Sequence, residues 1–260
     1  MSFRNILQKF LGIIYLPSYL AWADIRQRYR RSYLGPFWIT LSTAIMIGCM
    51  GLIFSQIFKA QLRDFLPYLC AGLITWSLIA SIINGSTVAY TSHEAMIKQL
   101  PLPIITHNLQ LCFREVYIFF HNILIYPVVC LIVGKALNFN LIFIIPGLTI
   151  VFLNLLWMSV IVGIISTRFR DISQIVSSII TVVFYITPIF WMPHMLPGRE
   201  AMFILGPNPF YHFIQVVREP LLGRLPSLTN WIICICLCLF GWVLAYIFLK
   251  KYENRIVYWL

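Results

Sequence analysis

The stretch Asp24–Trp38, DIRQRYRRSYLGPFW, separates an amphipathic N-terminal segment from a long hydrophobic one. On a helix, Trp22, Ile25 and Tyr29 share one stripe, and the charged residues lie on the opposite side or at its edges. An apolar stripe with aromatic residues and a cationic back is typical of a helix in a membrane interface. Gly35-Pro36 then predicts a break, because proline lacks the N–H that a continuing helix needs and restricts the residue before it.

The composition indicates a membrane protein with several spans. Of the 260 residues, 60% are hydrophobic and 10% are charged, whereas a soluble domain carries about 25% charged residues. The net charge of +11 does not indicate nucleic-acid binding, because the cations sit at the ends of hydrophobic runs. The arginines of Asp24–Trp38 fit either a solvated charge run that orients the protein or a specific binding role, and both roles are compatible.

Six stretches with little or no charge are long enough to cross a bilayer. Most of the 19 Lys and Arg residues fall in cytoplasmic segments if the N-terminus is inside, which places both termini in the cytoplasm. We therefore expect an all-α membrane protein with an N-terminal amphipathic interface segment over residues 1–35 and one membrane domain over residues 36–260. The expected spans are Pro36–Phe58, Phe65–Ser92, Val116–Val133, Leu141–Ser166, Ile172–Met192 and Leu228–Leu249.

Two connecting segments have unusual sequences. Thr91–Pro103 predicts a helix of one or two turns that ends at its prolines. Pro193–Ser227 is long, apolar and broken by proline and glycine, and its apolar pieces are too short to span. We expect two short helices there that dip back into the outer membrane face, with a start at Asn208 before Pro209. The alternative is an ordinary extramembrane loop.

A polar stripe accompanies the third span. Such a stripe on a membrane helix faces a bundle interior or a watery cavity. The alternatives are that only its last residue lies inside the membrane, or that His121 and Asn122 form hydrogen bonds between helices. The stripe consists of His107, Gln110, Arg114, Tyr117 and His121.

The sequence contains no pattern that indicates catalysis. A phosphate-binding G-x-x-x-x-G-K-[ST] loop is absent, so we do not expect this chain to bind ATP. The three aspartates, Asp24, Asp64 and Asp171, are far apart, and no cysteine and histidine have the spacing of metal ligands. We therefore expect no catalytic residues and no metal site, and the residues alone leave transport, channel and scaffold functions open.

The chain resembles the ABC-2 family of ATP-binding-cassette permeases, in the polysaccharide-export branch. The closest likeness is to O-antigen export permeases, and capsular and teichoic-acid permeases come next. The matching motifs cover nearly the whole chain in order. They are R-x-R-Y-R-R-S-Y-L-G-P-F-W at 26–38, PYLCAGL at 67–73, IKQLPLP at 97–103, RFRDI at 168–172, TPI at 187–189, NP at 208–209 and REPLLG at 218–223.

This resemblance implies that two copies of the chain pair with two copies of a separate ATPase that binds ATP and Mg. The implied substrate is a polysaccharide on undecaprenyl pyrophosphate, moved across the bacterial inner membrane from cytoplasm to periplasm. The resemblance also implies that the N-terminal helix contacts the ATPase and that spans one and five line the pore. A coupling helix would use Glu94, Ile97, Lys98, Gln99, Leu100 and Pro101, and a periplasmic gate would include Asn208, Pro209 and Arg218.

Further candidate residues follow from the chemistry of that substrate. Arginines next to a helix N-terminus favour phosphate, so Arg28, Arg30 and Arg31 are candidates for the pyrophosphate. Sugars stack on aromatic rings, which makes channel candidates of Phe37, Trp38, Phe184, Tyr185, Phe190 and Trp191. The alternative for these rings is a lipid-interface belt. Competing functions are export of another substrate, such as capsule, teichoic acid or a small molecule, and an enzyme of glycan-lipid assembly.

Overall fold

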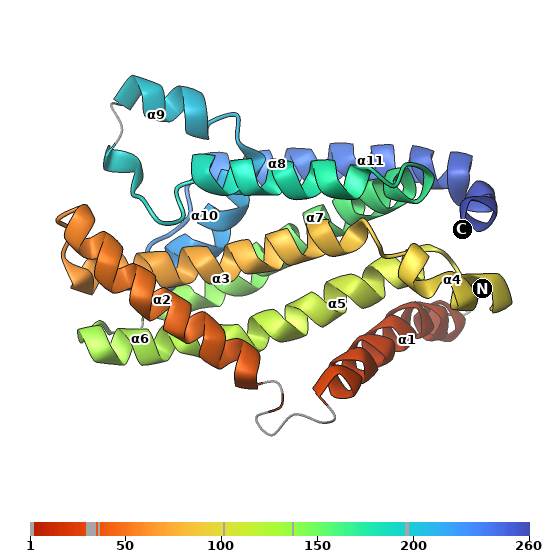
Figure 1. Ribbon diagram of the computed structural model, residues 1–260, viewed down its shortest axis with the longest axis horizontal. Coiled ribbons are helices and arrows are strands. Elements are labelled where there is room, and N and C mark those ends of the chain that lie inside the picture. The colour runs from red at the N-terminus through yellow and green to blue at the C-terminus, as the bar shows by residue number, and fades with distance from the viewer. Residues whose placement is uncertain (1–2, 30–34, 36, 101, 137, 196–197) are drawn as a thin grey trace.

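The computed structural model describes residues 3–29, 35, 37–100, 102–136, 138–195 and 198–260 (Figure 1). Throughout these ranges the regular structure is helical, as expected for an all-α membrane protein. The α-helices are α1 Phe3–Tyr29, α2 Phe37–Ile57, α3 Leu62–Ser86, α4 Glu94–Gln99, α5 Ile105–Asn122, α6 Ile125–Val133, α7 Ile144–Arg168, α8 Ile172–Ile186, α9 Gly198–Leu205, α10 Pro209–Leu221 and α11 Leu228–Trp259. Three short 3-10 helices are η1 Thr91–His93, η2 Phe139–Phe143 and η3 Pro193–Met195.

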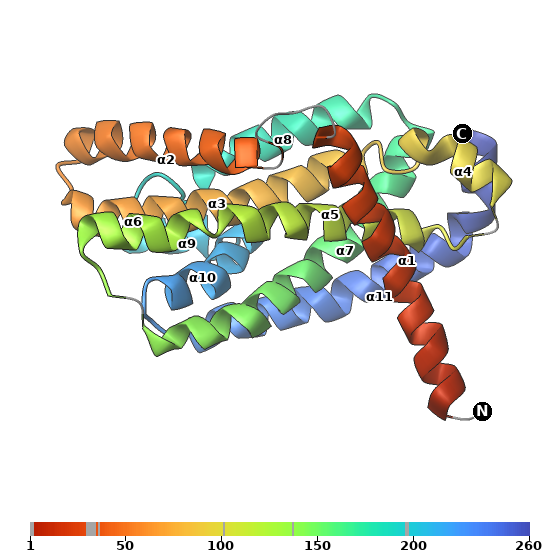
Figure 2. The ribbon, with the colours of Figure 1, turned by 90° about the horizontal axis from the view of Figure 1, so that it is seen from below.

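Helix α3 is the centre of the bundle. Its most apolar stretch is 83% buried, whereas that of α2 is only 11% buried. Figure 2 shows α2 and α8 along one face of the bundle and α7 and α11 along the opposite face. The apolar side chains of α2 and α8 are therefore largely uncovered within one copy of the chain.

Five helical segments are long and apolar enough to cross a membrane: α2, α3, α5 with α6, η2 with α7, and α11. Within the expected fifth span, Ile172–Met192, Pro188 predicts an interruption after Thr187, and α8 ends there, at Ile186, after 15 residues. That length corresponds to about 22 Å, less than a hydrocarbon core of about 30 Å. Thr187 is extended, with ψ 134°, as expected for a residue that precedes proline. The count of six spans stays a prediction.

The break after the opening stretch lies where the sequence predicts it. Helix α1 ends at Tyr29 and α2 begins at Phe37. Between them, Gly35 has a φ of +54°, a value that glycine adopts more readily than other residues. Helix α1 passes through Pro17, crosses α5 obliquely and projects from the bundle at its N-terminal end (Figure 2).

The segments expected in the cytoplasm share one end of the bundle. Helix α4, the start of α8 and the end of α11 lie together there (Figure 1). At the other end, α10 is inserted between α3, α7 and α11, and its Phe213, Ile214 and Val217 are fully buried. This burial excludes an ordinary surface loop for α10. Which end faces the cytoplasm stays a prediction.

Candidate functional site

The polar stripe of the third span lies against α1. His107 and Gln110 are buried, at 1% and 3% exposure, and Arg114 and Tyr117 are partly buried. Tyr117 Oη lies 2.6 Å from Ser18 Oγ on α1. The structure thus places the first four stripe residues at or beside the contact between α1 and α5, which we call the joint. His121, the fifth, instead contacts its own helix: its Nδ1 lies 2.8 Å from the Tyr117 carbonyl oxygen, one turn away.

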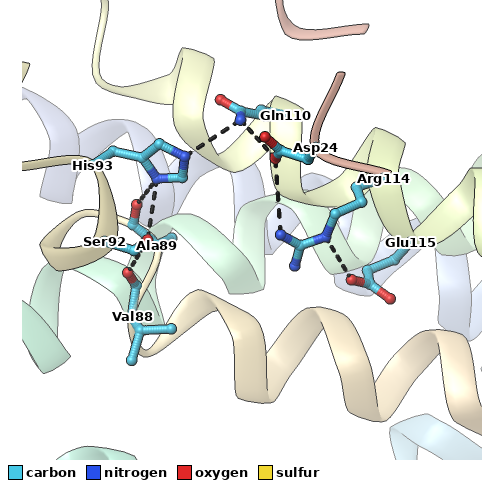
Figure 3. Close-up of polar contacts among 8 residues, drawn as sticks. All are labelled: Asp24, Val88, Ala89, Ser92, His93, Gln110, Arg114 and Glu115. Carbon is cyan, nitrogen blue, oxygen red and sulfur yellow. Dashed lines mark hydrogen bonds and ion pairs between the residues drawn. The ribbon is translucent and has the colours of Figure 1, made fainter. Parts of the chain in front are cut away.

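Asp24 is the anionic contact in this joint (Figure 3). Gln110 Nε2 donates a hydrogen bond to Asp24 Oδ2 at 2.8 Å, and Arg114 Nη1 lies 3.9 Å from the same oxygen. Arg114 Nε also donates to Glu115 Oε1 at 3.0 Å. The two carboxylates on either side of Arg114 hold its guanidinium at the contact between α1 and α5.

The same amide of Gln110 reaches the segment that precedes α4. His93 Nδ1 lies 2.8 Å from the Ala89 carbonyl oxygen, which can only accept, so Nδ1 carries the proton. His93 Nε2 is then an acceptor, and Gln110 Nε2 donates to it at 3.3 Å. Gln110 therefore links α1 to the turn that begins the short helix α4 (Figure 3). We call Asp24, Gln110 and His93 the polar link.

A cavity of about 430 Å³ adjoins the polar link. Asp24, Gln27, Ser92, His93 and Arg114 line it. The neighbouring His107 ring centroid lies 5.0 Å from that of His93, and neither of its ring nitrogens has a partner within the described part of the chain. The joint thus keeps unused polar groups inside, which lets its hydrogen bonds rearrange if α1 and α4 move relative to each other.

Helix α4 presents most of its predicted coupling residues to solvent. Glu94, Lys98, Gln99 and Leu100 are exposed, and Lys98 Nζ pairs with Glu94 Oε1 at 2.6 Å. Ile97 is half-buried against a small apolar cluster that includes Tyr90, Ile104 and Ile256. Pro101 lies outside the described residues. One apolar side chain thus anchors α4, and its polar surface stays free for contact.

A buried hydrogen-bond chain holds the segment before α4 in place. Tyr90, at 1% exposure, donates to Asn108 Oδ1 at 2.5 Å, and Asn108 Nδ2 donates to Ser159 Oγ at 2.8 Å. Burial raises the pKa of the Tyr90 phenol above its ordinary value, so the hydroxyl remains a donor. The α4 segment is in this way fixed to α5 and α7.

Helix α8 carries a polar stripe on its uncovered face. Four exposed side chains that carry an amide or a hydroxyl group recur there at helical spacing: Gln174, Ser178, Thr181 and Tyr185. Ser178 and Thr181 hydroxyls donate to carbonyls of their own helix at 2.9 Å, which leaves their lone pairs available as acceptors. Polar groups on the outer face of a membrane helix are expected to face water or another subunit rather than lipid.

The predicted channel aromatics form two separate groups. Phe184, Tyr185 and Phe190 have ring centroids 5.4–6.0 Å apart, and Trp191 Nε1 donates to the Tyr185 carbonyl at 3.1 Å. Phe37 and Trp38 are exposed, at 67% and 54%, at the start of α2. The group around Phe190 touches Phe54, near the far end of that helix. The groups thus lie at opposite ends of α2.

At the end of the bundle opposite α4, Arg218 is fully buried. Its Nη1 donates to the Pro188 carbonyl at 2.6 Å, its Nη2 donates to Gln215 Oε1 at 2.9 Å, and its Cζ lies 4.0 Å from the Tyr68 ring centroid. Arg218 therefore holds the unwound segment after α8 against α3 and α10.

Asn208 caps α10 beside this clamp. Its Oδ1 accepts from the backbone N–H groups of Phe210 and Tyr211 at 3.0 and 3.4 Å, with Pro209 in the first helical position. Asn208 Nδ2 donates to Thr187 Oγ1 at 2.8 Å. All three predicted gate residues thus lie beside the break that ends α8.

The phosphate candidates cannot be placed in the same way. Arg28 lies in the last turn of α1, and Arg30 and Arg31 lie outside the described residues. Sequence reasoning missed Asp24 and His93 as parts of the joint. Asp24 carried one usable signal, because it is the sole acidic residue in the chain before Asp64.

Comparison with known proteins gives the family. Residues 17–222 match the family model described as "ABC-2 type transporter". The chain is 25% identical over 197 residues to an O-antigen export system permease protein RfbA of Klebsiella pneumoniae, which covers 75% of this chain and 76% of that protein. It is 21% identical to the O-antigen export system permease protein RfbA of Myxococcus xanthus, with 72% of each chain covered. Because the family model matches most of its length, this chain belongs to the ABC-2 type transporter family.

Proposed function

We propose that this chain is the membrane subunit of an exporter that moves undecaprenyl-pyrophosphate-linked polysaccharide, of the O-antigen kind, from the cytoplasm to the periplasm. Two copies would form the pore in the bacterial inner membrane, with both termini cytoplasmic. Two copies of a separate ATPase would bind ATP and Mg. The relatives named O-antigen export permeases support the substrate class.

The observation that carries this proposal is the exposed polar stripe on α8. A hydrated glycan needs hydrogen-bonding groups along its path, and Gln174, Ser178 and Thr181 supply them on the uncovered face of α8. Tyr185, 61% exposed on the same stripe, adds an aromatic face on which a sugar ring can stack. A lipid-facing helix would place apolar side chains at these positions.

Energy would enter through α4. This helix is short and exposed, and it is fixed to α5 and α7 through Tyr90. A movement of the ATPase against Lys98 or Gln99 would reach α5 through this buried chain. The polar link would carry the same movement to α1, the helix that leads into the first span.

The substrate would enter at the start of α2. Arg28, Arg30 and Arg31 are the proposed pyrophosphate ligands, because guanidinium groups beside a helix N-terminus bind phosphate well. Phe37 and Trp38 would then meet the first sugars. At the outer end, the break after α8, which Arg218 contacts, would serve as the gate. The proline interrupts the helix there, so α8 and α10 can move as separate elements.

The test compares two exposed positions on α8. In the reconstituted complex with its ATPase, lipid-linked O-polysaccharide should stimulate ATP hydrolysis. Tyr185→Ala should reduce this stimulation about tenfold, which corresponds to about 1.4 kcal/mol of binding free energy lost with the ring on which a sugar would stack. Ile179→Ala is the matched control, since Ile179 is 53% exposed outside the polar stripe. Equal losses in both variants would contradict a role for the stripe.

The same assay separates the alternatives. If capsular or teichoic-acid intermediates, or small molecules, stimulate ATP hydrolysis and the O-polysaccharide does not, the exporter has one of those substrates instead. A chain that purifies from its host without any ATPase subunit would argue for an enzyme of glycan-lipid assembly.

A further inference from the structure

A groove of about 300 Å³ lies between the ends of α7 and α11. Two guanidinium groups, those of Arg168 and Arg255, line it together with the apolar side chains of Ile165 and Phe248. The aromatic residue Tyr252 completes the wall between them. The groove therefore combines a cationic part and an apolar part, and no step of the proposed transport uses it.

Within the described ranges, the two arginines of this groove have no acidic partner. Among the residues that the structure describes, no carboxylate lies within 4 Å of either guanidinium. Arg168 Cζ instead lies 5.5 Å from the Trp259 ring centroid and 5.9 Å from that of Phe169. These rings orient the guanidinium without neutralising it. Two like charges that line one cavity favour an anion between them, and arginine forks match phosphate geometry.

The groove lies where a membrane surface is expected. Helix α11 has 32 residues, about 48 Å, which exceeds a hydrocarbon core of about 30 Å. Its apolar part ends at Lys250-Lys251, so Phe248 lies at the edge of the core and Arg255 lies beyond it. Tyr and Trp side chains also favour this level. A ligand in the groove would thus have a phosphate near the arginines and apolar chains near Phe248.

We propose that this groove binds the headgroup phosphate of an anionic phospholipid. Basic pockets between transmembrane helices are typical sites for such headgroups. The apolar side chains favour a lipid over an acidic side chain of a protein partner, because the latter has no acyl chain to contact Ile165 and Phe248. A bound lipid would bridge α7 and α11 beneath α4, at the end where the ATPase is proposed to dock.

Native mass spectrometry of the purified full-length chain tests this site. Protein released from micelles that contain phosphatidylglycerol or phosphatidylcholine should retain phosphatidylglycerol selectively. The pair Arg168→Gln with Arg255→Gln should bind it roughly 30-fold more weakly, because each cation near a membrane surface contributes about fivefold. The control pair Arg170→Gln with Lys250→Gln removes the same charge from exposed positions outside the groove and should bind as the wild type does.

Three results would overturn the proposal. The first is an equal loss in the control pair, which would indicate general charge attraction. The second is displacement of the lipid by millimolar inorganic phosphate, which would indicate a site for free phosphate. The third is that the pair Arg168→Gln with Arg255→Gln retains the lipid as the wild type does but loses the ATPase during purification. That result would assign the two arginines to binding of the ATPase. Arg255→Gln alone should weaken lipid binding about fivefold. Because Arg255 is exposed, this single variant should fold normally and tests the site even if the double variant misfolds.

Discussion

At the scale of single residues, Gln110 decides how α1, α5 and the α4 segment meet. Gln110→Leu removes the donor shared by Asp24 and His93 and leaves a partly buried carboxylate and a partly buried imidazole with fewer partners. We expect a loss of stability of about 1–3 kcal/mol, seen as a lower thermal unfolding midpoint of the purified chain. In the reconstituted complex, glycan stimulation of ATP hydrolysis should fall as well, because α1 no longer follows α4.

Gln61→Leu is the control for this change. Gln61 is exposed at the opposite end of the bundle, and its side chain does not cap α3. It should leave both the midpoint and the stimulation unchanged. If Gln110→Leu behaves like this control, the polar link contributes neither stability nor coupling.

At the scale of elements, the contact between α7 and α10 depends on one glycine. A Cβ at Gly147 would lie 2.4 Å from the Val216 carbonyl oxygen, a backbone atom that cannot swing aside. Gly147→Ala should therefore push α10 away from α7 and cost about 1–3 kcal/mol. The check is the fraction of chain that remains monodisperse after heating in micelles. Gly48→Ala, where nothing lies within 4 Å, should be tolerated, and similar losses in both variants would contradict the close approach.

At the scale of the whole molecule, the uncovered face formed by α2 and α8 predicts contact with a second copy (Figure 2). Thr181→Cys, in a chain whose exposed Cys49 and Cys236 are replaced by Ser, should cross-link to its counterpart with a short bis-maleimide. Tyr246→Cys is the control, since Tyr246 is 64% exposed on α11, on the opposite face. A dimer band from Tyr246→Cys alone would place the second copy elsewhere.

Local chemistry made much of the fold predictable. Asn208 caps α10, Gly35 marks the break before α2, and the prolines at 101 and 103 predict the short helix that the structure begins at Glu94. Each of these signals acts within a few residues, so the sequence carries it directly. Pro188 likewise predicts the interruption of the fifth span after Thr187, and α8 ends at Ile186, because a proline disfavours helix in the residue before it.

The sequence by itself determined the class of molecule, the approximate spans and the family resemblance, because hydropathy, caps and breaks depend on neighbouring residues. Only the tertiary structure decided what the polar face of α5 meets. Asp24 and Gln110 are 86 positions apart and Arg218 and Pro188 are 30 apart, and helical periodicity shows which side chains share a face but not which helix covers it. The opening stretch is thus a predictable break, whereas the attachment of its helix to α5 through Asp24 depends on how the whole bundle packs.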